Sequence, residues 1–166
     1  MSSRILFIVN PKSNAARTKK NWEKVILPEI LKIFPAAYWS FTQKSSEASL
    51  LAHFAKKQAF DIVVAVGGDG TINEVVNGLL DNPLFEDKNF SPKIFNALSG
   101  THEFHVNSAP LATHVTPQLA FLPAGTGCDF IKTLKIPLDI PSALKVIANK
   151  KYILSDVGLI KYTSSK

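Results

Sequence analysis

Residues 63–80 read Val-Val-Ala-Val-Gly-Gly-Asp-Gly-Thr-Ile-Asn-Glu-Val-Val-Asn-Gly-Leu-Leu, and their hydrophobic period changes halfway. The run from Ile62 to Val66 is apolar and mostly β-branched, which is typical of a strand buried in a parallel sheet. Apolar side chains then recur at helical spacing up to Leu80, which predicts an amphipathic helix beginning at about Thr71. The stretch therefore predicts a strand, a glycine-rich loop and a helix in direct succession.

The loop between this strand and helix has the composition of a phosphate site. Gly67, Gly68 and Gly70 can adopt backbone angles closed to other residues and let a ligand approach the backbone amides. The helix start adds a potential that favours an anion. Asp69 would repel a bare phosphate, so we expect it to meet a magnesium-bound phosphate, a hydroxyl group or a transferable proton.

Simpler interpretations of the same loop remain open. Thr71 and Glu74 have the spacing of a capping box, in which both side chains bond to the first amides of their own helix. The four residues from Gly67 to Gly70 are also compatible with a tight turn. Two familiar phosphate motifs are excluded, because no G-x-x-x-x-G-K-[ST] run occurs and Asn73 stands where a dinucleotide motif has its third glycine.

The rest of the chain alternates between strand and helix patterns. Strands are predicted at Ile5 to Val9 and at Ala37 to Phe41, and helices at 17–33, where Pro28 can kink the helix, and at 46–58. This alternation predicts an α/β fold, a three-layer Rossmann-like parallel sheet with helices on both faces. Residues 82–118 break the alternation and are interpreted as an insertion.

Composition bounds the protein class. At 166 residues, 46% of them hydrophobic, we expect one folded domain. The formal charge of +6 favours an anionic partner without choosing among a nucleotide, a nucleic acid and an acidic membrane surface. A lone Cys128 fits a reducing compartment, and the chain shows neither a signal peptide nor a membrane span, so we expect a cytoplasmic protein.

Four segments in order resemble the diacylglycerol kinase catalytic family, which includes bacterial lipid kinases, sphingosine kinases and ceramide kinases. They are Asn10-Pro11-Lys12-Ser13, Thr42, the stretch 67–79, and Leu122-Pro123-Ala124-Gly125-Thr126-Gly127-Cys128-Asp129-Phe130. The family is distantly similar to NAD kinases and phosphofructokinases, and the resemblance implies that type of Rossmann-like fold. The four matching segments together span almost the whole chain.

The resemblance implies an ATP site between the strand ends, with ATP and Mg²⁺ as cofactors. Each matching segment follows a predicted strand, where open α/β sheets bind ligands. We expect Asp69 to be catalytic. The resemblance assigns nucleotide binding to Asn10, Pro11, Lys12, Ser13, Asn14, Thr42, Gly67, Gly68, Asp69, Gly70, Thr71, Ile72, Asn73, Gly125 and Thr126, and names no metal ligand. A second helix is expected to open at Thr126 or Gly127.

The chain departs from the family pattern at several positions. Asn14 stands where the family has Gly, and Asn tolerates a left-handed backbone. Cys128 stands where the family has Asn, which puts polar positioning in the cleft in doubt. Ile131-Lys132 replaces Ala-Arg, so the charge is kept without the guanidinium fork.

The predicted function is an ATP-dependent lipid kinase domain that transfers the γ-phosphoryl group to a lipid hydroxyl, of a diacylglycerol-like or sphingoid acceptor. Residues 1–154 would form the nucleotide-binding domain, and 155–166 would begin a missing β-rich C-terminal domain, entered by a strand at 154–160. Partners are a nucleotide and a lipid at a membrane surface, with peripheral attachment there, and no nucleic acid. The alternatives are a non-catalytic nucleotide-binding or regulatory module and an NAD kinase-like enzyme.

Overall fold

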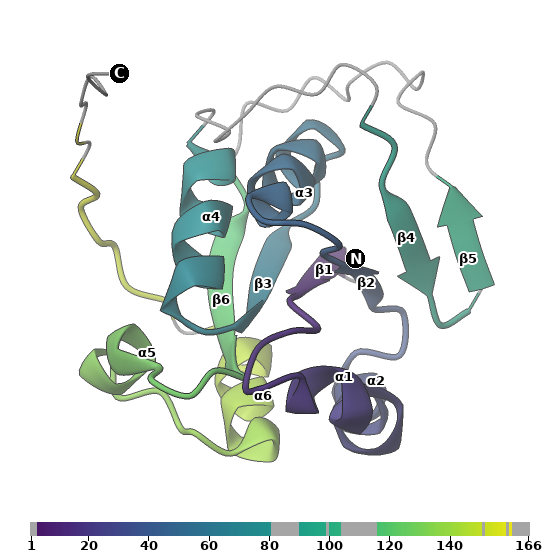
Figure 1. Cartoon of the computed structure of the whole chain (residues 1–166), viewed down its shortest axis with the longest axis horizontal. Helices are drawn as coiled ribbons and strands as arrows, with labels where there is room; N and C mark the ends of the chain where they lie inside the picture. The colour runs from purple at the N-terminus through teal and green to yellow at the C-terminus, as the bar shows by residue number, and fades with distance from the viewer. Residues whose placement is uncertain are drawn as a thin grey trace.

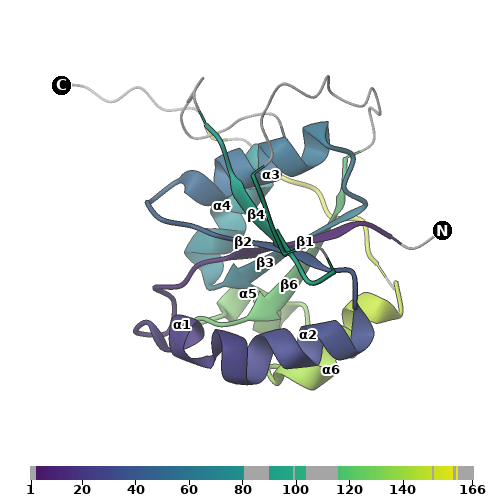
Figure 2. The ribbon, with the colours of Figure 1, turned by 90° about the vertical axis from the view of Figure 1, so that its right-hand side faces the viewer.

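The computed structural model of the chain describes residues 3–80, 90–98, 100–103, 116–150, 152–158 and 160. In this part of the chain one β-sheet lies between two layers of helices, with α3 and α4 on one face and α1, α2 and α6 on the other (Figure 1, Figure 2). The three-layer α/β fold expected from the sequence is confirmed.

The strands of the sheet are β1 Ile5–Val9, β2 Tyr38–Phe41, β3 Ile62–Gly67, β4 Lys93–Asn96, β5 Gly100–Glu103 and β6 Gln118–Pro123. Their order is β5-β4-β2-β1-β3-β6. β2, β1, β3 and β6 are parallel, whereas β4 and β5 run antiparallel to their neighbours. The expectation of a parallel sheet is wrong at this edge, because the short connection from β4 to β5 can join only antiparallel strands.

The helices are α1 Arg17–Asn21, the π-helical segment η1 Trp22–Ile26, α2 Leu27–Ile33, α3 Glu47–Lys57, α4 Asp69–Leu79, α5 Asp129–Thr133 and α6 Ile140–Ala148. The helix predicted at 17–33 therefore has a π-helical middle. Pro28 cannot donate to the carbonyl four residues back and its ring crowds that carbonyl. The turn before it is wider, with the N–H of Leu27 bonded to the carbonyl of Trp22.

The core explains why the central strands read as continuous apolar runs. Every residue of β1 is buried, and alternate side chains enter opposite layers. Leu6 and Ile8 pack in the cluster that includes α3, α4 and α5. Phe7 and Val9 pack in the cluster that includes η1, α2 and α6. Both faces of the sheet are thus covered, as expected for parallel strands.

The segment 82–118, interpreted as an insertion, contributes β4 and β5, which extend the sheet beyond β2. Residues 81–89, 99 and 104–115 lie outside the described residues. Near the end of the chain, residues 152–158 and 160 form neither helix nor strand, and Leu154 is 93% exposed. The strand expected at 154–160 is therefore wrong for the described part of that segment.

Candidate nucleotide site

Helix α4 begins at the glycine-rich loop, two residues earlier than predicted. Its first residue is Asp69 and its N-cap is Gly68. The N–H of Ile72 donates to the carbonyl of Gly68 at 3.1 Å, and the N–H groups of Asp69, Gly70 and Thr71 have no acceptor within the described residues. Free amides at a helix start are a natural position for an anion.

The capping box expected at Thr71 and Glu74 does not form. Because α4 begins at Asp69, Thr71 is already the third helical residue, and its buried hydroxyl accepts a hydrogen bond from Asn10 Nδ2 at 3.2 Å. The Glu74 carboxylate instead accepts from the backbone N–H groups of Ser46 at 3.0 Å and Ala48 at 3.2 Å, at the start of α3. Both side chains join the helix to other elements.

The glycines of the loop serve close packing, and none of Gly67, Gly68, Gly70 and Gly125 has a left-handed φ. The expectation of special backbone angles is therefore wrong for them. A Cβ on Gly125 would lie 2.5 Å from Gly68 Cα, so the two glycine-rich loops touch through their backbones. A Cβ on Gly70 would meet nothing within 4 Å. Gly70 is thus the glycine whose open side can face a ligand.

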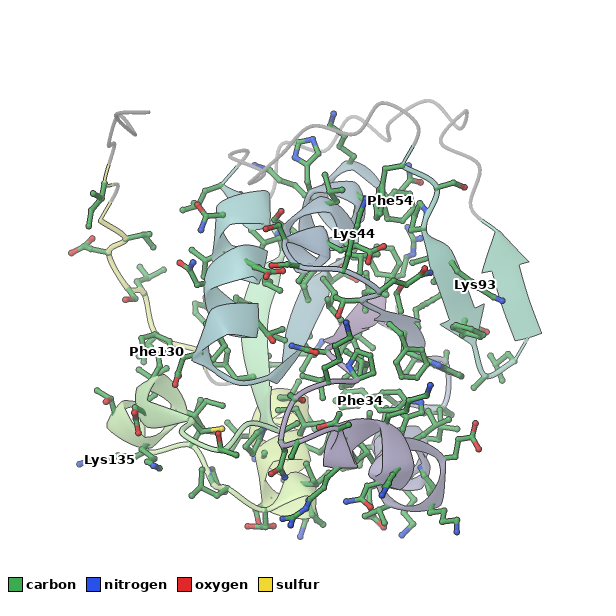
Figure 3. The ribbon with its side chains drawn as sticks, viewed as in Figure 1. Phe34, Lys44, Phe54, Lys93, Phe130 and Lys135 are labelled. Carbon is green, nitrogen blue, oxygen red and sulfur yellow. The ribbon has the colours of Figure 1, made fainter. Side chains whose placement is uncertain are left out.

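Asp69 links the two glycine-rich loops. Its carboxylate oxygens accept hydrogen bonds from the backbone N–H groups of Asp129 and Phe130, each at 3.2 Å. Figure 3 shows Phe130 where α5 approaches the start of α4. The first amides of α5 are therefore occupied, and the helix opens at Asp129 and not at Thr126 or Gly127. In the second expected phosphate site, only the loop at 125–127 is therefore left to bind a phosphate.

The loop after β1 is held by its own polar side chains. Asn10 Oδ1 accepts from the N–H of Lys12 at 3.0 Å, and Ser13 Oγ donates to the carbonyl of Asn10 at 2.8 Å. Asn14 has a left-handed φ of 52°, a conformation that Asn tolerates. Ala15 and Ala16 follow with φ of 53° and 62°, a conformation that alanine rarely adopts.

A cleft of about 240 Å³ opens where β1 and β2 end. It is lined by Asn10, Lys12, Thr42, Gln43, Lys44, Ser45, Ala48, Thr71 and Glu74. Sequence reasoning named Asn10, Lys12, Thr42 and Thr71 as site residues but missed the other five, which are Gln43, Lys44, Ser45, Ala48 and Glu74. The position of residues 43–45 just after a parallel strand could have identified these three. Two of the lining residues, Lys12 and Lys44, are cationic, and Lys44 is labelled in Figure 3.

Comparison with known proteins matches this arrangement of loops to one family. The family model "Diacylglycerol kinase catalytic domain" matches residues 4–160. The chain belongs to this family. The diacylglycerol kinase of Staphylococcus aureus (strain bovine RF122 / ET3-1) is 30% identical over 161 residues, covering 95% of the chain and 40% of the relative. That of Staphylococcus haemolyticus (strain JCSC1435) is 31% identical over 155 residues, covering 91% and 36%.

Solved structures agree with the sequence comparison. A crystal structure of a diacylglycerol kinase from Bacillus anthracis str. Sterne has a TM-score of 0.62 and 26% sequence identity, covering 90% of this chain and 43% of that chain. The chain thus spans about 40% of the length of the relatives that it matches.

Cys128 lies beneath the contact between the glycine loops. Its side chain is buried and its φ is 53°. The thiol is 3.5 Å from the carbonyl oxygen of Gly125 and 4.0 Å from that of Gly67. Cys128 is therefore a weak donor between two backbone acceptors, one from each loop.

The remaining residues expected from the diacylglycerol kinase pattern lie around the cleft without lining it. Pro11, Ser13 and Asn14 belong to the loop after β1, and Thr126 is exposed. Asn73 is exposed on α4, with its carbonyl bonded to Asn77 Nδ2 at 2.8 Å. The Ile72 side chain is part of the core, which leaves only its backbone for a ligand.

Proposed function

We propose that this chain is the nucleotide-binding part of an ATP-dependent lipid kinase, which transfers the γ-phosphoryl group to a lipid hydroxyl. The observation that carries the proposal is the free first turn of α4, with unbonded N–H groups at Asp69, Gly70 and Thr71, the last of which lines the cleft. Such amides bind phosphate oxygens. Lys12 and Lys44 add positive charge in the same cleft. Membership of the diacylglycerol kinase catalytic domain family supports phosphate transfer as the use of this site.

Most residues of the expected nucleotide site receive a role in this proposal. The amides from Gly68 to Thr71 and those of Gly125 and Thr126 hold phosphate oxygens. Asn10 and Thr42 line the cleft between the strand ends. The rest of the loop from Asn10 to Asn14 holds Asn10 in place. Phosphoryl transfer depends chiefly on such positioning and on charge stabilisation.

Asp69 is the catalytic candidate, and its surroundings fit Mg²⁺. A Cβ on Gly127 would lie 3.5 Å from Asp69 Oδ2 and 3.6 Å from Asp129 Oδ2, so two carboxylates flank this glycine. Mg²⁺ is commonly held by one or two carboxylates together with substrate phosphates, and it would supply neutralisation of phosphate charge. The two hydrogen bonds of Asp69 leave further lone pairs on its oxygens. Asp69 can therefore orient the acceptor hydroxyl or take its proton.

During transfer the acceptor oxygen forms a bond to the γ-phosphorus, and the bond from that phosphorus to the β–γ bridging oxygen breaks. ADP leaves, and the hydroxyl proton passes to a base, a role we assign to Asp69. The relatives are named diacylglycerol kinases, which favours a lipid acceptor over NAD.

We propose that the binding site for the lipid acceptor is completed by a further domain. Because the chain spans about 40% of its relatives, we propose that 1–154 forms the nucleotide-binding domain and that 155–166 leads into a domain completing the lipid site. In the described part of the chain no helix is both long and apolar enough to cross a bilayer. We propose that the lipid is reached peripherally, at the membrane surface.

A non-catalytic nucleotide-binding module is the second candidate, favoured by Cys128 in place of Asn. Lipid phosphorylation separates the two candidates. The polypeptide encoded by the full reading frame should transfer label from ATP to diacylglycerol in mixed micelles if the protein is a kinase. Nucleotide binding without transfer would support the binding module.

Titration calorimetry with ATP and Mg²⁺ tests the nucleotide site itself. Gly70→Val places a side chain in the open space before the free amides, so we expect it to abolish binding without unfolding the protein. Gly158→Val is the matched control, because Gly158 also meets nothing within 4 Å but lies in the exposed segment near the end of the chain. Unchanged binding by Gly70→Val, or no binding by the folded chain, would contradict the proposal.

A further inference from the structure

The loop from β2 to α3 forms one wall of the cleft, and two carboxylates hold its backbone. Glu47 accepts from the N–H groups of Gln43 and Lys44, the latter at 3.1 Å. Glu74 accepts from the N–H groups of Ser46 and Ala48 at 3.0 and 3.2 Å. Four amides between 43 and 48 are thus bonded to two side chains, one from α3 and one from α4.

Glu74 partly replaces the cap that the N-cap residue of α3 does not supply. Its N-cap residue Ser46 has a left-handed φ of 65° and makes no side-chain cap bond. A helix start without a cap leaves free N–H groups and a positive potential. Glu74 satisfies one of these amides from a neighbouring helix, and Glu47 turns back onto the preceding loop.

Close packing of α3 against α4 lets Glu74 reach this loop. A Cβ on Gly78 would lie 2.0 Å from the carbonyl oxygen of Ser49, so the two backbones approach where no side chain fits between them. Glu74 is one helical turn before Gly78, on the same side of α4. The contact that needs the glycine therefore brings the carboxylate to the start of α3.

We infer that Glu47 and Glu74 are positioning residues of the nucleotide cleft, an inference that rests on the proposed function. By fixing the backbone at 43–48, they hold the side chains of Gln43, Lys44 and Ser45 along the cleft wall before a ligand arrives. A wall fixed in advance lowers the ordering cost of binding. Glu47 is the sharper case, because it is buried and does not line the cleft.

The test compares ATP binding with loop protection in the 166-residue chain. Both N–H groups bond to the same oxygen, Oε2, so Glu47→Gln keeps the shape of the side chain and an acceptor oxygen but removes the charge that strengthens the two bonds. We expect the Kd for ATP with Mg²⁺ to rise roughly fivefold to tenfold, the scale of one charge-assisted hydrogen bond. Hydrogen exchange should become faster at Gln43 and Lys44. Glu74→Gln should likewise raise the Kd and make hydrogen exchange faster at Ser46 and Ala48. Either variant alone tests the inference if the other is poorly folded.

The control is Asp139→Ala, which removes a capping carboxylate from α6 in the other helix layer. It should lower the melting temperature and leave the Kd unchanged. An unchanged Kd and unchanged exchange in both glutamate variants would overturn the inference while the proposed function stands, as would an equal rise of Kd in Asp139→Ala. No ATP binding by the unmodified folded chain would overturn the proposed function and the inference together.

Discussion

The carboxylate of Asp69 accepts a hydrogen bond from the backbone N–H of Phe130, and the two residues lie 61 positions apart in the chain. Its other oxygen accepts from the N–H of Asp129. Asp69 therefore caps α5 while it belongs to the first turn of α4. The residue proposed to act on the phosphoryl group also fixes the relative position of the two glycine-rich loops.

Asp69→Asn should change both stability and transfer. The amide keeps one acceptor oxygen but turns an NH₂ group toward a second N–H, so the free energy of unfolding should fall by about 1 kcal/mol. Phosphoryl transfer should fall much further, because the amide cannot take a proton or supply charge to a cation. Melting temperature and lipid phosphorylation by the full-reading-frame polypeptide, assayed well below both melting temperatures, check this. Near-normal turnover would leave Asp69 with its capping role alone.

Two glycines of α4 should respond oppositely to alanine. Gly78→Ala forces a methyl group against the carbonyl of Ser49 and should cost about 1–3 kcal/mol of stability. Gly70→Ala adds a methyl group in open space near the helix start and should stabilise by up to about 1 kcal/mol. Denaturant unfolding of both variants measures the difference. Equal stability of the two would mean that α3 and α4 do not pack as closely as Gly78 indicates.

Cys128→Asn should keep or raise the melting temperature. Asn tolerates the left-handed backbone of this position, and its NH₂ can donate to both carbonyls, of Gly125 and Gly67, that lie near the thiol. Cys128→Ala, which lacks any donor, should melt lower. Thermal unfolding with ATP titration of each variant checks this order, and a marked loss of stability in the Asn variant would refute it.

The Cys128 thiol should also react slowly in the folded protein. It is 4% exposed, so alkylation should follow unfolding and not precede it. Thiol labelling along a denaturant series measures this, with the unfolded chain as the reference. Rapid labelling in native buffer, with loss of ATP binding, would instead support a redox role for this residue.

Asp139 should make stability depend on pH at acid values. Hydrogen bonds from Ser142 lower the pKa of the Asp139 carboxyl below its ordinary value. The contribution is therefore fully present above about pH 4, the ordinary range for an unfolded Asp, and is lost as pH falls through the lowered folded pKa. The difference in melting temperature between the chain and Asp139→Ala should be constant above about pH 4 and shrink below it. A difference independent of pH in this range would contradict the cap.

The sequence by itself determined the alternation of strands and helices and the edge of the sheet where the cleft opens. Continuous apolar runs such as Ile5–Val9 and the helical spacing after Gly70 are patterns of neighbouring residues, so they can be read without knowing the fold. The apolar runs follow from the burial of both faces of the sheet. The cleft residues Asn10 and Thr42 followed from the same logic, because parallel strands end at a common edge.

Only the tertiary structure decided which groups the polar side chains and glycines meet. Glu74 has the spacing of a local cap, yet its partners are 26 and 28 residues away. The antiparallel β4 and β5, the contact of Gly68 with Gly125, and the capping of α5 by Asp69 also join distant segments. Local spacing states what a side chain can bond to, whereas the packing of layers selects the partner that comes within hydrogen-bonding distance.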